Sequence, residues 1–208
     1  MKNKNAVVGG VVLVLVVGGL LVWSAKLQTP TPEAMPITVA DPSGLPGLQI
    51  GEAPWIFSVE GVAERMKADN LAQLSAEGQA LHIHQHLDIF VNGTPVAVPA
   101  NIGVGQRWIS PIHTHNASQI VHIESPIIAS FTLGQFFDVW GVKLTETTLG
   151  GYVADETRSL TVYVNGEKYV GDPRMLELGE RQQITIVYGT DSETPSPIPS
   201  TYQFPEGY

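Results

Sequence analysis

The stretch LHIHQHLDIFVNG, Leu81–Gly93, decides the fold of this 208-residue chain. Apolar and polar residues alternate along the first eleven positions, which predicts a β-strand with one buried face, and Gln85 is the one polar residue on the apolar side. The opposite face carries a row of ionisable side chains: His82, His84, His86 and Asp88. The strand therefore combines a structural face with a face that can bind a ligand.

The same stretch ends in a strong turn signal. Asn92-Gly93 favours a two-residue type I′ turn, because both residue types tolerate the positive φ angles that this turn needs. A hairpin folded about this turn places apolar residues opposite one another, Ile89 opposite Val96 and Leu87 opposite Val98. The segment Leu160–Gly166 repeats the signal as LTVYVNG, without histidines, and predicts a second hairpin.

Two helices and two further strands follow from periodicity and capping signals. Ser58–Leu74 predicts an amphipathic helix that begins with a serine N-cap. Thr132–Trp140 predicts a second helix, because its first residue and Gln135 form a capping box. Strands are expected at Gln119–Glu124 and Gln183–Tyr188. The predicted fold class is α+β: a mostly antiparallel β-sheet with one or two short covering helices, preceded by an N-terminal transmembrane helix.

An uncharged, apolar stretch lies near the beginning of the chain. Ala6–Ala25, with about 20 residues, is long enough to cross the hydrocarbon core of a membrane as a helix. A cleaved signal peptide is the alternative, but Trp23 stands where a small residue would precede the cleavage site. Two lysines precede the stretch and one follows it closely, so the positive-inside tendency predicts a single-pass membrane protein with its C-terminal domain outside the cytoplasm.

Prolines mark the domain boundaries. Six prolines between Gln28 and Trp55 disfavour helix and central strand, and four more follow Asp191 among polar residues. We therefore expect a transmembrane anchor at residues 1–27 and a Pro/Gly-rich linker at 28–55. A His-rich α+β domain should follow at 56–190, with a flexible tail at 191–208.

Charge and cysteine content exclude several classes of function. Without Lys2, Lys4 and Lys26, the chain has 8 Lys and Arg residues against 20 Asp and Glu, a formal balance of −12 that favours cations over anionic partners. A nucleic-acid partner is not expected, because clustered basic residues are missing. Since the chain has no cysteine, it can form no disulfide, and any metal must be bound by nitrogen and oxygen.

All six histidines lie within Leu81–Pro126. Residues two apart on a strand project from one face about 6.6 Å apart, so two neighbouring imidazoles can bind one ion at about 2.0–2.1 Å. Three in a row cannot, because His82 and His86 are about 13 Å apart. We expect an adjacent pair to join histidines from other segments, with the rest in support or in a second site. The candidate metal ligands are His82, His84, His86, His113, His115 and His122, and Asp88 and Glu124 are candidates to orient an imidazole.

The type of ligand also limits the metal. Imidazole suits copper, zinc, nickel and iron, and copper(II) has the highest affinity in the divalent series. Outside the cytoplasm and without sulfur ligands, a copper ion is the preferred cofactor and a zinc ion the second choice. The sequence therefore predicts a membrane-anchored metal-binding protein that acts in metal handling, and it does not predict the protein partner.

Three other functions stay open at this point. One is a metal-dependent enzyme with several histidine ligands and an open coordination position. Another is a structural or interaction module without metal, whose histidines stabilise a polar core, and the third is a cluster that titrates between about pH 5 and 8. No catalytic residue is predicted, because the chain has neither a His-Glu-x-x-His nor a Gly-x-Ser-x-Gly motif.

The combined motifs resemble those of a bacterial family of membrane-anchored or exported proteins. The matching segments are His82–Gly93, Ile112–Ser118, His122–Pro126, Thr132–Gly141 and Val162–Gly166, and the similarity covers about Trp55 to Gly189. The resemblance implies the limits of the domain and no particular activity. The family pattern places cysteines near Thr148 and Val153, so this chain departs from it there and a thiol role is not expected.

Overall fold

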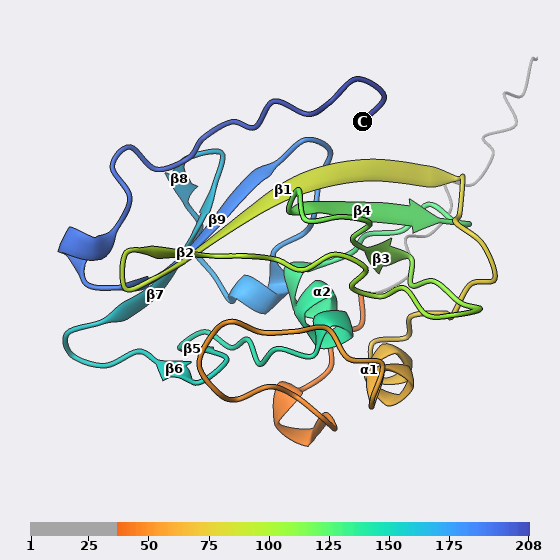
Figure 1. The fold of residues 1–208 in the computed structure, drawn as a ribbon, viewed down its shortest axis with the longest axis horizontal. Helices are drawn as coiled ribbons and strands as arrows, with labels where there is room; N and C mark the ends of the chain where they lie inside the picture. The colour runs from red at the N-terminus through yellow and green to blue at the C-terminus, as the bar shows by residue number, and fades with distance from the viewer. Residues whose placement is uncertain (1–36) are drawn as a thin grey trace, which may run out of the picture. The chain divides into compact units, whose positions relative to one another are not determined.

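The computed structural model describes residues 37–208, and these residues form an α+β fold (Figure 1). The predicted transmembrane anchor lies outside them. Seven strands form one mixed sheet in the order β3-β4-β1-β9-β7-β8, with β2 paired to the C-terminal part of β1. The strands of this sheet are β1 Leu81–Val91, β2 Thr94–Val96, β3 Ile112–His113, β4 Ile120–Ser125, β7 Ser159–Val164, β8 Glu167–Lys168 and β9 Gln183–Gly189.

Strand β1 runs through the middle of the sheet and has the bounds predicted from its alternation. Along one edge it pairs antiparallel with β4 and then with β2, and along the other it pairs parallel with β9. Asn92 has a φ of 49° and Gly93 a φ of 75°, the positive values expected of a type I′ turn. Ile89 pairs with Val96 as predicted. The structure therefore confirms the predicted strand, the turn after it and the first pair of the hairpin.

The predicted pairing of Leu87 with Val98 is wrong. Strand β2 ends at Val96 and does not extend to Val98. Gln119 pairs with Leu87 instead. The N–H of Leu87 donates to the main-chain carbonyl of Gln119 at 3.0 Å, and the N–H of Val98 faces its side-chain oxygen at 3.3 Å. Pro99 weakens any longer return strand, because proline has no N–H to donate to a ladder.

The second predicted hairpin is confirmed. Strands β7 and β8 join through Asn165, with a φ of 53°, and Gly166, with a φ of 84°. The last strand, β9, lies between β1 and β7, parallel to the first and antiparallel to the second. The sheet is therefore mixed, a feature that alternation within single strands cannot predict, because it does not show the direction of the neighbouring strand.

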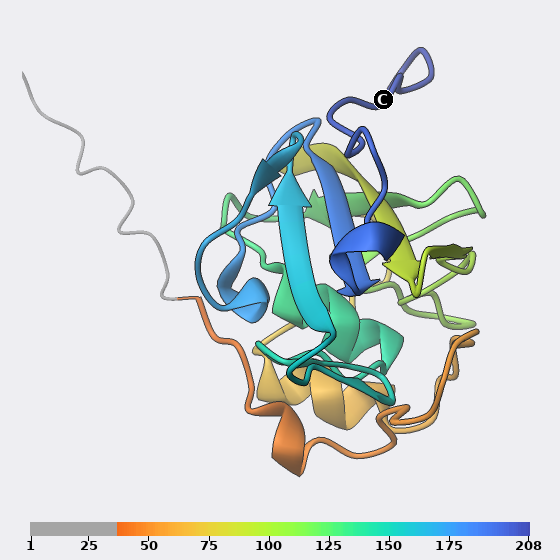
Figure 2. The same cartoon turned by 90° about the vertical axis from the view of Figure 1, so that its left-hand side faces the viewer.

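Helix α2 (Leu133–Trp140) packs against one face of the sheet (Figures 1 and 2). Its predicted capping box is present: the N–H of Gln135 donates to the hydroxyl of Thr132, and the N–H of Thr132 donates to the side-chain oxygen of Gln135. Phe136, Phe137 and Trp140 are fully buried in the core, as their helical spacing predicts. The apolar face of β1 belongs to the same core, so its histidine row faces the other way.

Helix α1 (Val62–Ala68) is shorter than the predicted Ser58–Leu74. Gly61 precedes it with a φ of 67°, and Asn70 follows it with a φ of 57°. Both values lie in the left-handed region, which a right-handed helix cannot include and which these two residue types tolerate best. The predicted serine cap is therefore wrong, and its hydroxyl accepts the N–H of Glu60 instead.

Three of the four two-residue strands in the described part of the chain were not predicted, because so few positions show no alternation and, unlike β8, they do not follow an Asn-Gly turn. They are β3 in the main sheet and β5 (Thr148–Leu149) and β6 (Tyr152–Val153), which form a sheet of their own. Three 3-10 helices complete the elements of residues 37–208: η1 Pro42–Gly44, η2 Pro173–Met175 and η3 Asp191–Glu193. Within residues 37–208, no helix has the length and apolar character to cross a membrane.

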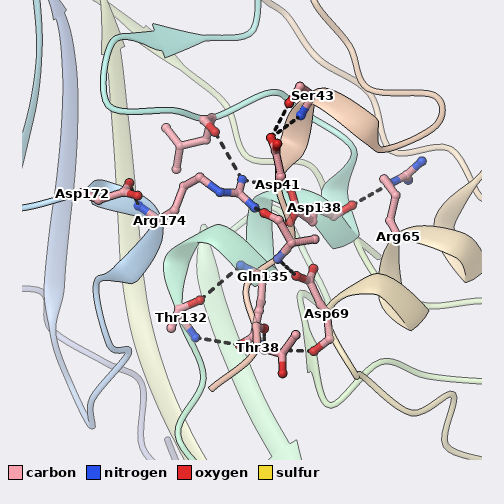
Figure 3. A network of polar contacts seen from close by, with 12 residues as sticks. Thr38, Asp41, Ser43, Arg65, Asp69, Thr132, Gln135, Asp138, Asp172 and Arg174 are labelled. Atoms are coloured by element: carbon pink, nitrogen blue, oxygen red, sulfur yellow. Dashed lines mark hydrogen bonds and ion pairs between the residues drawn. The ribbon is translucent and has the colours of Figure 1, made fainter. Parts of the chain in front are cut away.

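A buried polar network connects α2 to the segments around it (Figure 3). Arg174 makes a two-bond ion pair with Asp138 of α2, at 3.1 Å and 2.5 Å. Asp69, which ends α1, accepts the N–H of Ala40 at 2.7 Å. Burial and then the charge of Asp138 raise the pKa of Asp69 to about 8. In this network Asp138 therefore carries the negative charge and Asp69 keeps its proton at neutral pH.

We expect Asp69→Asn to remove a pH dependence of stability. Because the folded protein keeps a proton that the unfolded chain releases above its pKa of 3.8, the stabilisation is complete below that value and is lost as the pH rises through about 8. The slope in this window is at most about 1.4 kcal/mol per pH unit. Asparagine has the same shape and does not titrate, so the variant should gain stability relative to the parent protein as the pH rises.

Urea unfolding in the presence of EDTA, from about pH 6 to about pH 9, measures this difference. Glu167→Gln, on the exposed strand β8, removes a carboxylate outside the network and serves as the control. Parallel stability curves for Asp69→Asn and the parent protein would show that Asp69 is ionised throughout this range.

Candidate metal centre

Three neighbouring strands place histidines side by side on the sheet. In the pairing of β1 with β4, His84 lies opposite His122, and in the pairing of β4 with β3, His113 lies opposite His122. Neighbouring strands are about 4.8 Å apart, so imidazoles in such a row are within contact distance. The ring centroids of His84 and His122 are 4.6 Å apart, and those of His113 and His122 are 5.4 Å apart. Strand register therefore brings together three separate segments.

Each end of this row has a second histidine two residues away. His82 and His84, the β1 pair, have their Nε2 atoms 3.2 Å apart. His113 and His115, the β3 pair, have theirs 3.1 Å apart. Neighbouring ligands of a tetrahedral ion with bonds of about 2.0–2.1 Å are separated by about 3.4 Å. Both pairs therefore have nearly the spacing of two ligands on one ion.

The carboxylate of Glu124 lies between the two pairs. Its Oε1 is 3.2 Å from Nδ1 of His122, 3.3 Å from Nε2 of His82, 3.6 Å from Nε2 of His115 and 3.9 Å from Nε2 of His113. Glu124 is only 4% exposed, and within residues 37–208 its ion-pair partners are all histidines. A buried carboxylate is costly unless a cation neutralises it.

These residues form two overlapping groups that could hold a metal ion. One contains His82, His84, His122 and Glu124, and the other contains His113, His115, His122 and Glu124. Within each group, one ligand atom from every residue lies within 4.8 Å of the others. The shared members, His122 and Glu124, both belong to β4, and each of the flanking segments contributes one pair.

The protonation states of the cluster suit metal binding. Burial lowers the pKa of His84 and of His113 to about 4. Burial opposes ionisation of Glu124, but its contacts with the surrounding imidazoles, first of all the hydrogen bond from His122, outweigh it and lower the pKa of Glu124 to about 2. Nδ1 of His113 donates to the carbonyl of Ser110 at 2.9 Å, which leaves its Nε2 as a free ligand atom. Neutral imidazoles and an ionised carboxylate are the forms that bind cations.

His86 and Asp88 lie together outside both groups. Nδ1 of His86 is 2.9 Å from the side-chain oxygen of Gln183 and 3.8 Å from Asp88. Asp88 accepts hydrogen bonds from the side-chain amides of Gln119 and Gln183. The structure thus brings together five of the six candidate histidines, with Glu124 among them, while Asp88 lies beside the sixth.

Sequence reasoning missed Glu77 and the contacts of the C-terminal tyrosines. Oε1 of Glu77 is 3.6 Å from Nε2 of His115, but a single glutamate in a loop gives no signal in the sequence. The segment predicted as a flexible tail lies over the histidine row of β1 (Figure 1): the ring of Tyr202 stacks on His86 at 3.7 Å, and the ring of Tyr208 is 4.9 Å from that of His84.

No protein-family model matches this chain, and no curated protein or solved structure matches it either. The class of protein is therefore defined by its own fold and site. Residues 37–208 form an α+β domain with a cluster of histidines and one glutamate that could hold a metal ion.

Proposed function

We propose that this chain is a membrane-anchored, extracytoplasmic metal-binding protein that acts in metal handling, as a carrier, buffer or assembly factor. The observation that carries the proposal is the buried carboxylate of Glu124 among five imidazoles. A structural polar core would need a positive partner for this charge, and two of the surrounding rings, His84 and His113, have their pKa lowered by burial and stay neutral. A metal cation bound by these rings would supply positive charge beside the carboxylate.

The outer members of the two pairs support exchange of the ion with the surroundings. The side chain of His82 is 52% exposed and that of His115 is 35% exposed, whereas the other ligands are buried. An ion can therefore enter and leave through the exposed side of the cluster without unfolding the sheet. This arrangement fits a protein that loads and releases metal.

Copper is the first choice of metal and zinc the second. The ligand set consists of imidazole nitrogens and one carboxylate, and the chain has no cysteine. Among divalent ions, copper(II) has the highest affinity for nitrogen ligands. The location outside the cytoplasm rests on the uncharged stretch Ala6–Ala25 and its flanking lysines, and the relation to the bacterial family rests on the shared motifs.

A metal-dependent enzyme is the second candidate. It is supported by the same exposed edge at His82 and His115, because water or a substrate could reach an ion held there. Azide binding to the copper-loaded protein separates the two functions. A new charge-transfer absorption band would show an open coordination position, as an enzyme requires, and an unchanged spectrum would favour the carrier.

We expect the full-length protein, purified without a histidine tag, to retain a transition metal in stoichiometric amount. Elemental analysis after gel filtration measures the amount, and reloading of EDTA-treated protein with copper(II) or zinc(II) sulfate tests the preference. Copper should be retained against a competing chelator at concentrations that remove zinc. Protein that retains no metal after reloading, with an unchanged circular dichroism spectrum, would disprove the proposed function.

A further inference from the structure

We infer that the cluster is a two-metal centre, in which the β1 pair holds one divalent ion, the β3 pair holds a second, and the carboxylate of Glu124 bridges them. This inference rests on the proposed metal-binding function and deepens it. It concerns the number of ions and the role of the residues that the two groups share.

A single ion cannot take both histidine pairs in this arrangement. Two opposite ligands of one ion, at bonds of about 2.0–2.1 Å, are at most about 4.2 Å apart. The ligand atoms of the five histidines and Glu124 do not all lie within 4.8 Å of one another. They form two overlapping groups that each meet this limit. The nitrogens inside each pair, in contrast, are 3.2 Å and 3.1 Å apart, close to the spacing of neighbouring ligands. Each pair is therefore arranged for its own ion.

Glu124 has the position that a bridging ligand needs. It lies on β4, the strand between β1 and β3, directly opposite His82 in the register. One of its oxygens, Oε1, is 3.3 Å from the β1 pair at His82 and 3.6 Å from the β3 pair at His115. Both distances are close to the ligand spacing of about 3.4 Å, so an ion at either pair can share this carboxylate.

The charge of the cluster also suits two ions with a bridging anion. Two-metal sites hold their ions about 3.5–4 Å apart, and a bridging carboxylate offsets the repulsion between them. Glu77, whose Oε1 is 3.6 Å from His115, adds a second carboxylate beside the β3 pair. His122 supplies a further nitrogen to one of the two ions, which gives that ion at least four protein ligands with Glu124.

The number of bound ions tests the inference. Metal-free full-length protein is titrated with zinc(II) sulfate and analysed for bound zinc after gel filtration, and we expect two equivalents per chain. His82→Ala/His84→Ala and His113→Ala/His115→Ala should each bind one equivalent. The equivalent that each double variant retains also shows that the variant is folded, so either one is the control for the other.

The bridge is tested with copper(II), which is paramagnetic. With two equivalents bound, the electron paramagnetic resonance signal should be weaker than that of two isolated ions, because ions that share a carboxylate are magnetically coupled. Each double variant should give the full signal of one isolated ion, and Glu124→Gln should abolish the coupling and weaken binding of the second ion by at least about tenfold.

Each other outcome overturns a defined part of the inference. One equivalent in the parent protein, lost in both double variants, would show a single-ion centre and leave the proposed function intact. Two equivalents with uncoupled spectra would show that Glu124 is not a bridge. A chain that binds no zinc and no copper would disprove the inference together with the proposed function.

Discussion

His122→Ala is expected to weaken binding of the ion that its imidazole holds by more than about 100-fold, and to weaken binding of the other ion less, through the shared carboxylate of Glu124. Residues that only support a metal ligand typically cost about 10–100-fold when they are replaced, and a ligand costs more. His122 belongs to both groups and its Nδ1 is 3.2 Å from Glu124, so its loss removes a ligand and also the hydrogen-bond donor of the buried carboxylate. Competition with a chelating dye for copper(II) measures the change in affinity.

His86→Gln is the matched control for this experiment. His86 lies on the same sheet face and is 6% exposed, against 4% for His122, but it belongs to neither group. Glutamine can keep a hydrogen bond to Gln183, which His86 contacts at 2.9 Å. The control should bind copper as tightly as the parent protein. If both variants lose affinity equally, the ligands are not the two groups that share His122.

The parts of the fold that depend on neighbouring residues could be predicted from the sequence. The alternation along Leu81–Val91 fixes a strand and its two faces, and Asn92-Gly93 fixes the turn after it. The capping box at Thr132 likewise fixes the start of α2. Each of these signals depends only on residues that are close together in the sequence. The short helix α1 shows the limit, since two residues in the left-handed region outweigh the apolar periodicity between them.

The site could be predicted only in part, because strand register is not a local property. The spacing of His82, His84 and His86 limits how many of them can reach one ion, and the structure places the third outside both groups. The pairing of His84 with His122, and of His113 with His122, depends on which strands lie next to each other. For the same reason, the sequence assigned Glu124 to orienting one imidazole, whereas the structure places one of its carboxylate oxygens within 3.9 Å of four of the five clustered imidazoles.

The buried network around Asp138 gave no signal in the sequence at all. The network joins residues from three distant segments, Asp69, Asp138 and Arg174, and no motif or spacing in the sequence marks any of them. Only the packing of α1 and η2 around α2 brings them together (Figure 3). Once together they are strongly coupled, because a buried charge interacts with its neighbours at a low dielectric constant. Sequence reasoning therefore misses a contribution to stability that the structure makes testable.

Arg174→Met should destabilise the fold by about 3–5 kcal/mol, which is the usual cost of breaking a buried ion pair from one side. Arg174 bonds both oxygens of Asp138 and the carbonyls of Ala40 and Leu144, and Asp138 is fully buried. Methionine keeps much of the apolar stem and leaves the carboxylate without its cation. Urea unfolding in EDTA measures the loss, and Arg107→Met, at an exposed position, should change the unfolding free energy by less than about 0.5 kcal/mol.

The cause of this loss can be separated from a simple loss of packing. Arg174→Met/Asp138→Asn removes the stranded charge as well, so the double variant should be more stable than Arg174→Met alone. The cost of Arg174→Met should also shrink as the pH falls toward the unfolded-chain pKa of 3.8, because burial raises the pKa of Asp138 and the folded variant, without the guanidinium, takes up a proton more readily. If the cost of Arg174→Met is independent of pH and the second substitution adds to it, the stabilisation comes from the packing of the arginine stem and its bonds to main-chain carbonyls, and the ion pair contributes little.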